Sequence, residues 1–146
     1  MERDEIRAVV ERLIAAWNAH DPGAAAACYS PEAIMRDVGR GSAMPDREWI
    51  LRSISDYIGA FPDLQAEISS LGIDGDVAYV EWQGTGTHSR EFMGIAPTNR
   101  LVEMHGCTVV KVGPDGLIAT EAAYWDVAGL LQQIGLLPEA PAPAPA

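Results

Sequence analysis

Glu121 is the residue whose surroundings in the sequence most suggest chemistry. It is the one charged residue inside the apolar segment 117–125, which reads as a strand. Side chains alternate along a strand, so Glu121 shares a face with Ala119, Ala123 and Trp125. A carboxylate, two small residues and a large aromatic ring are typical of a cavity wall rather than of a packed core. We therefore expect Glu121 to be the buried acid of a mostly apolar pocket.

Burial would give such a carboxyl group useful properties. Desolvation raises the pKa of a carboxylic acid, so Glu121 would serve as a hydrogen-bond donor or as a general base near neutral pH. Two alternatives remain open. Glu121 pairs with an arginine as a structural acid, or a β-bulge shifts the alternation of side chains in this strand.

Two further residues are candidates for catalysis. His88 ends the predicted strand 77–88 on its inward face, near the mouth of the pocket, where an imidazole binds a polar group or transfers a proton. The alternative is a structural histidine bonded to a loop backbone. Asp37 would supply a second carboxylate beside Glu121, or it forms a surface ion pair with Arg36.

The walls of the pocket are predicted from the same alternation. The strand 100–112 carries apolar or small residues at one parity and mixed residues at the other, so the first set faces inward. Aromatic side chains there would suit a flat apolar substrate, although core packing explains each of them taken alone. The predicted substrate-binding residues are Trp82, Trp125, Tyr57, Met104, Gly106, Thr108 and Ala123.

Helices and then strands must position these residues. Apolar residues at helical spacing predict helices at 4–19, 47–58 and 127–134, and Asp126 is read as the cap of the last one. A short helix begins at Asp21-Pro22, and residues 34–38 form a brief strand followed by a loop. Strands at 64–71 and 77–88 pair through the turn at Asp74-Gly75, and strands at 100–112 and 117–125 follow.

This order of elements predicts an α+β fold. We expect a curved, mostly antiparallel sheet wrapped on the N-terminal helices, which forms a cone with an internal pocket. One domain would span residues 1–137. The segment 138–146 is rich in proline and alanine, and we expect a disordered or polyproline-like tail.

Composition and charge exclude several classes of function. A formal net charge of -11 would repel nucleic acid and anionic membrane surfaces. No apolar run is long enough for a membrane span, and the acidic N-terminus is unlike a signal peptide, so we expect a cytoplasmic protein. Cys28 and Cys107 fit no disulfide framework, and the three histidines have no metal-site spacing, so we expect no metal.

Several motifs resemble the SnoaL-like polyketide and ester cyclase family, within the nuclear-transport-factor-2-like cone folds. They are Gly86-Thr87-His88, residues 92–100 (FMGIAPTNR), residues 61–64 (FPDL), residues 115–118 (DGLI), and Trp125-Asp126 followed by residues 129–135 (GLLQQIG). The resemblance implies that the protein uses no cofactor and acts in polyketide biosynthesis. It also implies a homodimer through the outer sheet face, which carries Glu103, His105, Cys107 and Val109.

The sequence departs from this family at two polar positions. The aldol-type cyclases of the family carry a catalytic aspartate six residues before the glycine that is here Gly129, and this position is Ala123. An assisting histidine aligns with Thr108. Without a positioned base, deprotonation of a carbon acid loses about two to four orders of magnitude. We therefore expect chemistry other than the aldol reaction, with Glu121 as a relocated acid or one that serves a different ring closure.

Three functions remain open on the sequence alone. The first is a cofactor-free cyclase that closes a ring in a hydrophobic polyketide-type intermediate by [4+2] cycloaddition or conjugate addition. The second is an epoxide hydrolase or isomerase that uses Asp37 and Glu121 as a carboxylate pair on a small apolar substrate. The third is a non-catalytic binding or assembly module.

Overall fold

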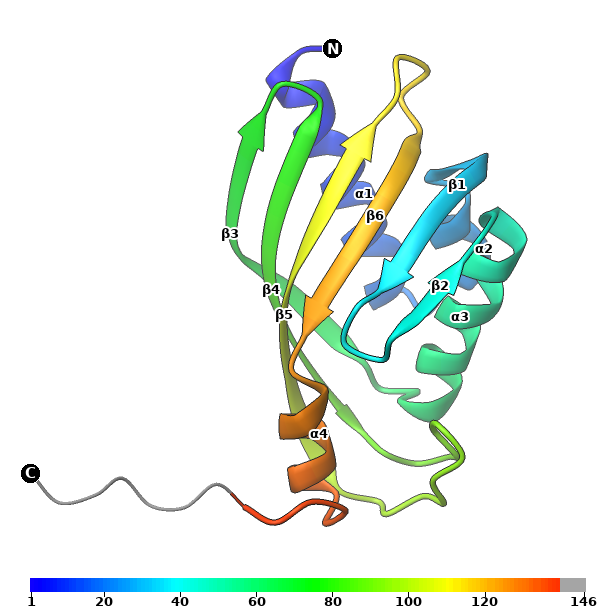
Figure 1. Ribbon diagram of the computed structural model, residues 1–146, viewed down its shortest axis with the longest axis vertical. Coiled ribbons are helices and arrows are strands. Elements are labelled where there is room, and N and C mark those ends of the chain that lie inside the picture. The colour runs from blue at the N-terminus through cyan, green and yellow to red at the C-terminus, as the bar shows by residue number, and fades with distance from the viewer. Residues whose placement is uncertain (140–146) are drawn as a thin grey trace, which may run out of the picture.

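The computed structural model describes residues 1–139, and Figure 1 shows a curved sheet with α1 and α3 against its concave side. The predicted α+β class is confirmed, and most of the predicted tail lies outside the described residues. Within the described chain, no helix is long and apolar enough to cross a membrane. The elements are α1 (Arg3–Asn18), α2 (Pro22–Ala26), β1 (Tyr29–Asp37), β2 (Ser42–Met44), α3 (Arg47–Ala60), β3 (Gln65–Asp74), β4 (Val77–Thr87), β5 (Leu101–Val112), β6 (Ile118–Trp125) and α4 (Val127–Gln133).

Acidic residues fix the starts of the helices. Asp21, Asp46 and Asp126 each accept a hydrogen bond from the backbone N–H three residues later, at 3.0, 3.0 and 2.8 Å. At α1, the Glu5 carboxylate accepts the backbone N–H of Glu2 at 2.8 Å. These carboxylates satisfy N–H groups that lack a partner in the first turn, and they interact favourably with the helix dipole. The predicted cap at Asp126 is therefore confirmed.

The sheet brings the first strand beside the last one. Its strand order is β2-β1-β6-β5-β4-β3, and β1 pairs with β6 in parallel while the other pairs are antiparallel. Two strand predictions were incomplete: β1 begins at Tyr29 rather than at residue 34, and β2 was expected to be a loop. The first half of β1 was not predicted because it contains Pro31, which is uncommon inside a strand. The pairing of β1 with β6 is irregular there, with a register shift between Tyr29 and Ile34.

The predicted alternation of side chains holds in β4 and β5. The set at even positions in β5, including Val102, Met104 and Val110, is buried, and the set at odd positions lies on the outer face. In β6 the alternation holds only after a bulge. On β5, Lys111 pairs with Thr120 and Val112 pairs with Ile118, so Ala119 is the extra residue of the bulge. The prediction that Ala119 shares the face of Glu121 is therefore wrong.

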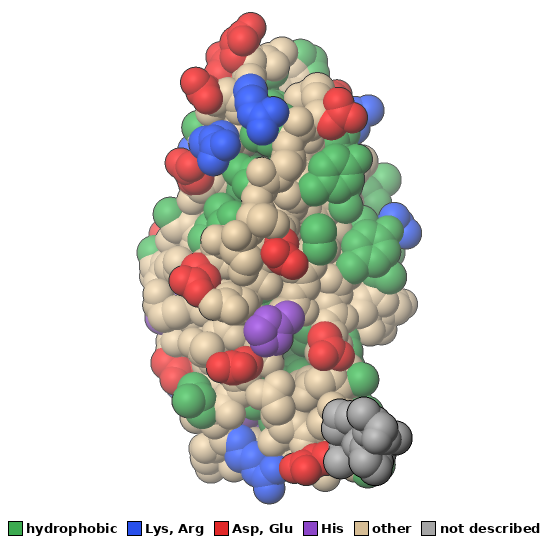
Figure 2. All heavy atoms as spheres, turned by 90° about the vertical axis from the view of Figure 1, so that its left-hand side faces the viewer, with side chains coloured by type: hydrophobic (Ala, Val, Ile, Leu, Met, Phe, Trp, Pro, Cys, Tyr) green, Lys and Arg blue, Asp and Glu red, His purple; other side chains and the backbone are tan. Residues whose placement is uncertain are grey.

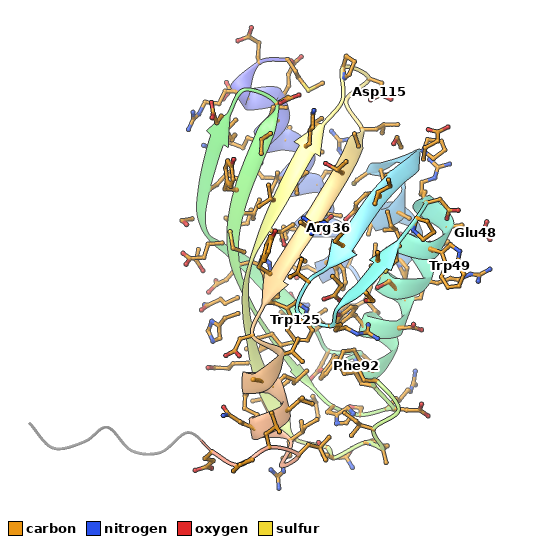
Figure 3. All side chains as sticks on the ribbon, viewed as in Figure 1. Arg36, Glu48, Trp49, Phe92, Asp115 and Trp125 are labelled. Carbon is orange, nitrogen blue, oxygen red and sulfur yellow. The ribbon has the colours of Figure 1, made fainter. Side chains whose placement is uncertain are left out.

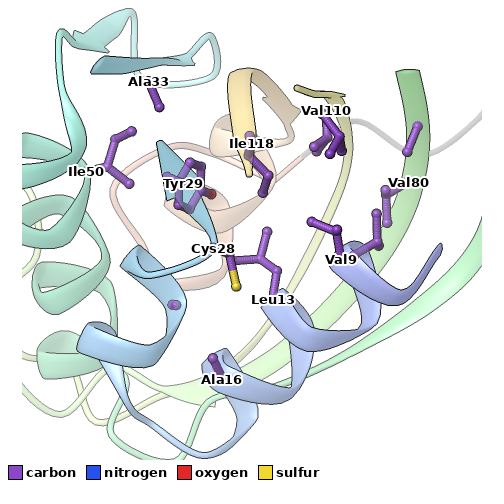
Figure 4. Close-up of a cluster of buried hydrophobic side chains, with 14 of the residues drawn as sticks. Val9, Leu13, Ala16, Cys28, Tyr29, Ala33, Ile50, Val80, Val110 and Ile118 are labelled. Atoms are coloured by element: carbon purple, nitrogen blue, oxygen red, sulfur yellow. The ribbon is translucent and has the colours of Figure 1, made fainter. Parts of the chain in front are cut away.

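The hydrophobic core has two parts that meet at the inner face of the sheet. The larger part packs α1, α2 and α3 against the strands, and Figure 4 shows Tyr29 within it, between Ile50 and Ile118. The smaller part surrounds Phe61 and Phe92, near α4. Residues of both parts line the cavity that forms the candidate site.

Candidate active site

A cavity of about 130 Å³ lies between the inner face of the sheet and helices α1 and α3. Pockets for drug-sized ligands have about 300–1,000 Å³, whereas a dry engineered cavity of about 150 Å³ binds benzene. This cavity therefore encloses a group of about one ring. The predicted residues that line it are Asp37, Glu121, Tyr57, Trp82, Met104, Thr108, Ala123 and Trp125.

Glu121 is a buried acid in this cavity, with 8% of its surface exposed. The Tyr29 hydroxyl donates a hydrogen bond to its Oε1 atom, so the alternative of an arginine partner is wrong. The pKa of Glu121 is raised from 4.5 to about 7: burial is the main cause, the hydrogen bond from Tyr29 opposes the rise, and the negative charge of Asp37 adds to it. Glu121 thus exchanges a proton in the neutral range.

Asp37 is the second acid, with 1% of its surface exposed. Its Oδ1 atom accepts hydrogen bonds from Trp125 Nε1 at 2.8 Å and from the backbone N–H of Arg40 at 3.1 Å. Its Oδ2 atom accepts a hydrogen bond from the Tyr57 hydroxyl. The alternative of a surface pair with Arg36 is wrong, because Arg36 is exposed and donates to Tyr124. The three neutral donors hold the Asp37 carboxylate in one orientation.

The two tyrosines respond to the same burial. Desolvation raises the pKa of Tyr29 and of Tyr57, and the neighbouring carboxylates of Glu121 and Asp37 raise them further. Both hydroxyls therefore stay protonated and donate at neutral pH. Tyr57 is among the predicted wall residues, whereas Tyr29 was not predicted, because the residues around Pro31 are typical of a turn after a helix and not of a strand.

Gly106 shapes the cavity without being one of the residues that line it, which corrects the predicted contact with substrate. It pairs with Trp82 on β4 and with Trp125 on β6. A Cβ atom at Gly106 would lie 2.6 Å from Trp82 Cζ2 and 2.7 Å from Trp125 Cβ. The missing side chain leaves room on β5 for the Trp82 ring and for the first atoms of the Trp125 side chain. Trp82 Nε1 also donates to Thr108 Oγ1 at 3.0 Å.

His88 lies elsewhere, and its predicted place at the mouth of the pocket is wrong. Its side chain is fully buried, packs on the Phe61 ring at 5.7 Å between centroids, and is absent from the cavity lining. The backbone N–H of Thr98 donates to His88 Nδ1 at 3.3 Å. This contact agrees with the structural alternative, a histidine bonded to the loop that follows β4.

A larger hollow of about 620 Å³ lies on the outer face of the sheet. It is bordered by exposed or half-buried residues such as Glu81, His105 and Tyr124. Figure 2 shows the side where β3 and β4 lie, with acidic side chains dispersed over it. We place the site in the smaller inner cavity, because that cavity contains the buried acids. Among the described residues, no cluster of His, Cys, Asp and Glu is arranged to hold a metal ion.

The inner cavity combines an acid that titrates near neutral pH with a second carboxylate fixed by neutral donors. Among the described residues, Glu121 Oε2 receives no hydrogen bond, so this oxygen is available to a bound molecule. An apolar wall excludes water and strengthens hydrogen bonds to such a molecule. The arrangement suits proton transfer to or from a small, mostly apolar group.

Known proteins share this fold over nearly the whole chain. AclR from Streptomyces galilaeus, a candidate hydroxylase, is 26% identical with a TM-score of 0.84, covering 96% of this chain and 87% of its own. TsrD from Streptomyces laurentii is 23% identical with a TM-score of 0.84, covering 94% and 99%. IdmH from Streptomyces antibioticus, a candidate polyketide cyclase, is 28% identical with a TM-score of 0.76, covering 89% and 98%.

No curated protein matches the sequence. The family model described as SnoaL-like polyketide cyclase matches residues 7–134, which include all the strands and the cavity. The resemblance of the motifs is thus confirmed over most of the chain, and the protein belongs to the SnoaL-like polyketide cyclase family.

Proposed function

We propose that this protein is a cofactor-independent cyclase that closes a ring in a hydrophobic polyketide-type intermediate. The observation that carries the proposal is Glu121, a buried acid with a pKa of about 7 and a free oxygen in an apolar cavity. The cavity holds about one ring, so the segment that cyclises enters it. Confinement of the two reacting ends of the chain lowers the activation barrier by several kcal/mol.

The aldol route is disfavoured, because both of its polar groups are missing at cavity positions. Ala123 and Thr108 face each other across β6 and β5, and both line the cavity. Conjugate addition fits Glu121 better. Its carboxylate removes a proton from the attacking hydroxyl or carbon acid, a bond forms to the β-carbon of an enone, and the same proton returns to the α-carbon. The product is an isomer of the substrate.

A [4+2] cycloaddition is the second way to close the ring. It needs no proton transfer, only a hydrogen bond from protonated Glu121 to a carbonyl group of the substrate and a fixed orientation of the chain. The variant Glu121→Gln separates the two reactions, since glutamine donates a hydrogen bond but takes up no proton. Conjugate addition would lose about two to four orders of magnitude in rate, and cycloaddition would be retained.

The experiment is a conversion assay on synthetic linear polyenones, read by chromatography and mass spectrometry. Ring closure gives a product of unchanged mass at a new retention time, and it requires no added metal or nucleotide. Glu11→Gln, an exposed change of the same type on α1, is the matched control. Turnover that survives Glu121→Gln together with Gly106→Leu, which fills the space beside the indoles, would falsify the assignment of this cavity.

An epoxide hydrolase or isomerase is the alternative that one observation favours. Asp37 and Glu121 both line the same cavity, from adjacent strands, which a carboxylate pair acting on one substrate atom requires. The same assay distinguishes it when small epoxides are included. Hydrolysis adds the mass of one water, isomerisation adds nothing, and a non-catalytic module converts neither class of substrate.

A further inference from the structure

The charged groups that line the cavity are all acidic. Asp37 and Glu121 contribute carboxylates, and no lysine, arginine or histidine of the described chain is among the lining residues. The groups that hold the two acids, namely Tyr29, Tyr57 and the Trp125 indole, are neutral donors. Hydrogen bonds therefore orient the two carboxylates, but no positively charged residue in the lining neutralises them. An anionic ligand would be repelled.

Aromatic rings form much of the remaining wall. The rings of Trp17 and Trp125 meet Tyr57 edge-on, with centroids 6.0 and 5.9 Å apart, and Trp82 lies across Gly106 from Trp125. The N–H groups of Trp82 and Trp125 are already bonded to protein acceptors. These rings therefore offer π-electron surface to a ligand in the cavity, and their polar edges are occupied.

One ring of this aromatic cluster, that of Tyr57, already contacts a positively charged group of the protein. The Arg40 guanidinium lies 5.4 Å from the centroid of the Tyr57 ring and 5.3 Å from that of Phe92. Phe92 and Trp125 lie toward the same end of the molecule (Figure 3). Arg40 is not among the cavity residues. The interior of the cavity thus has aromatic walls and acids without a basic group of its own.

We propose that this cavity binds small organic ammonium ions, with a methylated nitrogen against the aromatic rings and beside the carboxylate of Glu121. Aromatic rings and a carboxylate are the groups that recognise a quaternary nitrogen in proteins. A volume of about 130 Å³ suits a nitrogen with a few methyl groups or one such group on a longer substrate. This inference goes beyond the proposed ring closure and does not require that reaction.

The binding has a defined dependence on pH. Glu121 has a pKa of about 7, so the fraction of it that is ionised rises about tenfold between pH 6 and pH 8. The titratable groups around it are Tyr29 and Asp37 from β1 and Tyr57 from α3, while the lining residues from α1, β3, β4 and β5 are neutral. A permanently charged ligand should therefore bind about tenfold more tightly at pH 8 than at pH 6.

Titration calorimetry with tetramethylammonium chloride tests the proposal, at constant ionic strength. The neutral isostere tert-butanol is the control ligand, and Glu11→Gln is the control variant. We expect the cation to bind more tightly than tert-butanol in the wild type, and about tenfold more weakly to Glu121→Gln at pH 8 with no remaining pH dependence. Trp17→Leu should weaken binding, and Trp17→Phe should restore most of it.

Equal binding of tert-butanol, or no binding of the cation, overturns the proposal in favour of a neutral apolar ligand. A pH dependence that persists in Glu121→Gln overturns the role given to this carboxylate. The outcome is separate from that of the cyclase assay. Tetramethylammonium binding without turnover of any polyenone supports the cation site and counts against ring closure. Turnover of a polyenone without tetramethylammonium binding supports ring closure and counts against the cation site.

Discussion

Asp37 and Ala123 are direct neighbours in the parallel pairing of β1 with β6. Thr108 is the neighbour of Ala123 on the other side, in β5. The position at which the aldol-type relatives carry their aspartate is therefore occupied by alanine, and an acid stands beside it on the adjoining strand. Glu121, two residues earlier in β6, is the other acid of the cavity. The negative charge of Asp37 raises the pKa of Glu121, and this effect can be measured.

Replacement of Asp37 by asparagine should lower the pKa of Glu121 below about 7. The negative charge of Asp37 is one of the causes that raise this pKa, and asparagine removes the charge while it keeps most of the volume. The measurement is a carbon NMR titration of the glutamate side chains, with the Glu121 signal assigned through Glu121→Gln. Asp56→Asn, at an exposed site of α3, should leave the titration of Glu121 unchanged.

The opposite shift is expected for Tyr29→Phe. The hydrogen bond from the Tyr29 hydroxyl stabilises the ionised carboxylate, so its loss should move the pKa of Glu121 above about 7. The same titration measures it. Tyr79→Phe removes an exposed hydroxyl from the outer face of β4 and serves as the control. An unchanged or lower pKa in Tyr29→Phe would show that this contact does not tune the acid.

Glu121→Gln should stabilise the protein at high pH while it abolishes proton transfer. The folded-state pKa is raised from 4.5 to about 7, so the folded protein holds a proton that the unfolded chain has lost, and stability falls as pH rises through this window. The loss of folding stability caused by ionising Glu121 is fully present above pH 7, and it corresponds to about 3 kcal/mol at 1.36 kcal/mol per pKa unit. Urea unfolding at pH 4 and pH 8 measures it.

We expect the variant to gain up to about 3 kcal/mol at pH 8 and little at pH 4, because the carboxyl group is neutral in both states at low pH. Glu11→Gln should show neither gain. A gain of equal size at both pH values would point to improved packing in place of a removed charge.

A methyl group at Gly106 should disturb the cavity more than a methyl group elsewhere in the sheet. Gly106→Ala places a Cβ atom 2.6 Å from Trp82 Cζ2, so the indole must shift, at a cost of about 1–3 kcal/mol. Gly72→Ala in β3 is the matched control, since no atom lies within 4 Å of its added Cβ. Thermal unfolding and tryptophan fluorescence report the two effects, and equal behaviour of the two variants would contradict the prediction.

We further propose that the outer face of the sheet forms a homodimer, as the family resemblance implies. Glu103, His105, Cys107 and Val109 lie on this face, where the alternation in β5 placed them. Light scattering should give twice the chain mass of 15.6 kDa. Val109→Glu would place a charge in the interface and yield monomers, whereas Trp49→Glu, on the exposed side of α3, would not. A monomeric wild type at micromolar concentration removes the proposal.

The sequence by itself determined the features that depend on local spacing. Helix starts follow from acidic residues that bond to nearby N–H groups, as at Asp46 and Asp126. The inward faces of β4 and β5 follow from a period of two, and Glu121 keeps its predicted face because the bulge at Ala119 precedes it. The predicted site residues other than His88 and Gly106 line one cavity.

Only the tertiary structure decided which groups these residues meet. The parallel pairing of β1 with β6 joins segments about ninety residues apart in sequence, and it brings Tyr29 to Glu121 and Asp37 to Trp125. The start of β1 could not be predicted from local sequence, because Pro31 is untypical of a strand. His88 lies just beyond the end of β4 at Thr87 and packs against Phe61, a contact that the alternation along the strand does not predict. Alternation tells which side a residue faces, whereas long-range packing sets its partners.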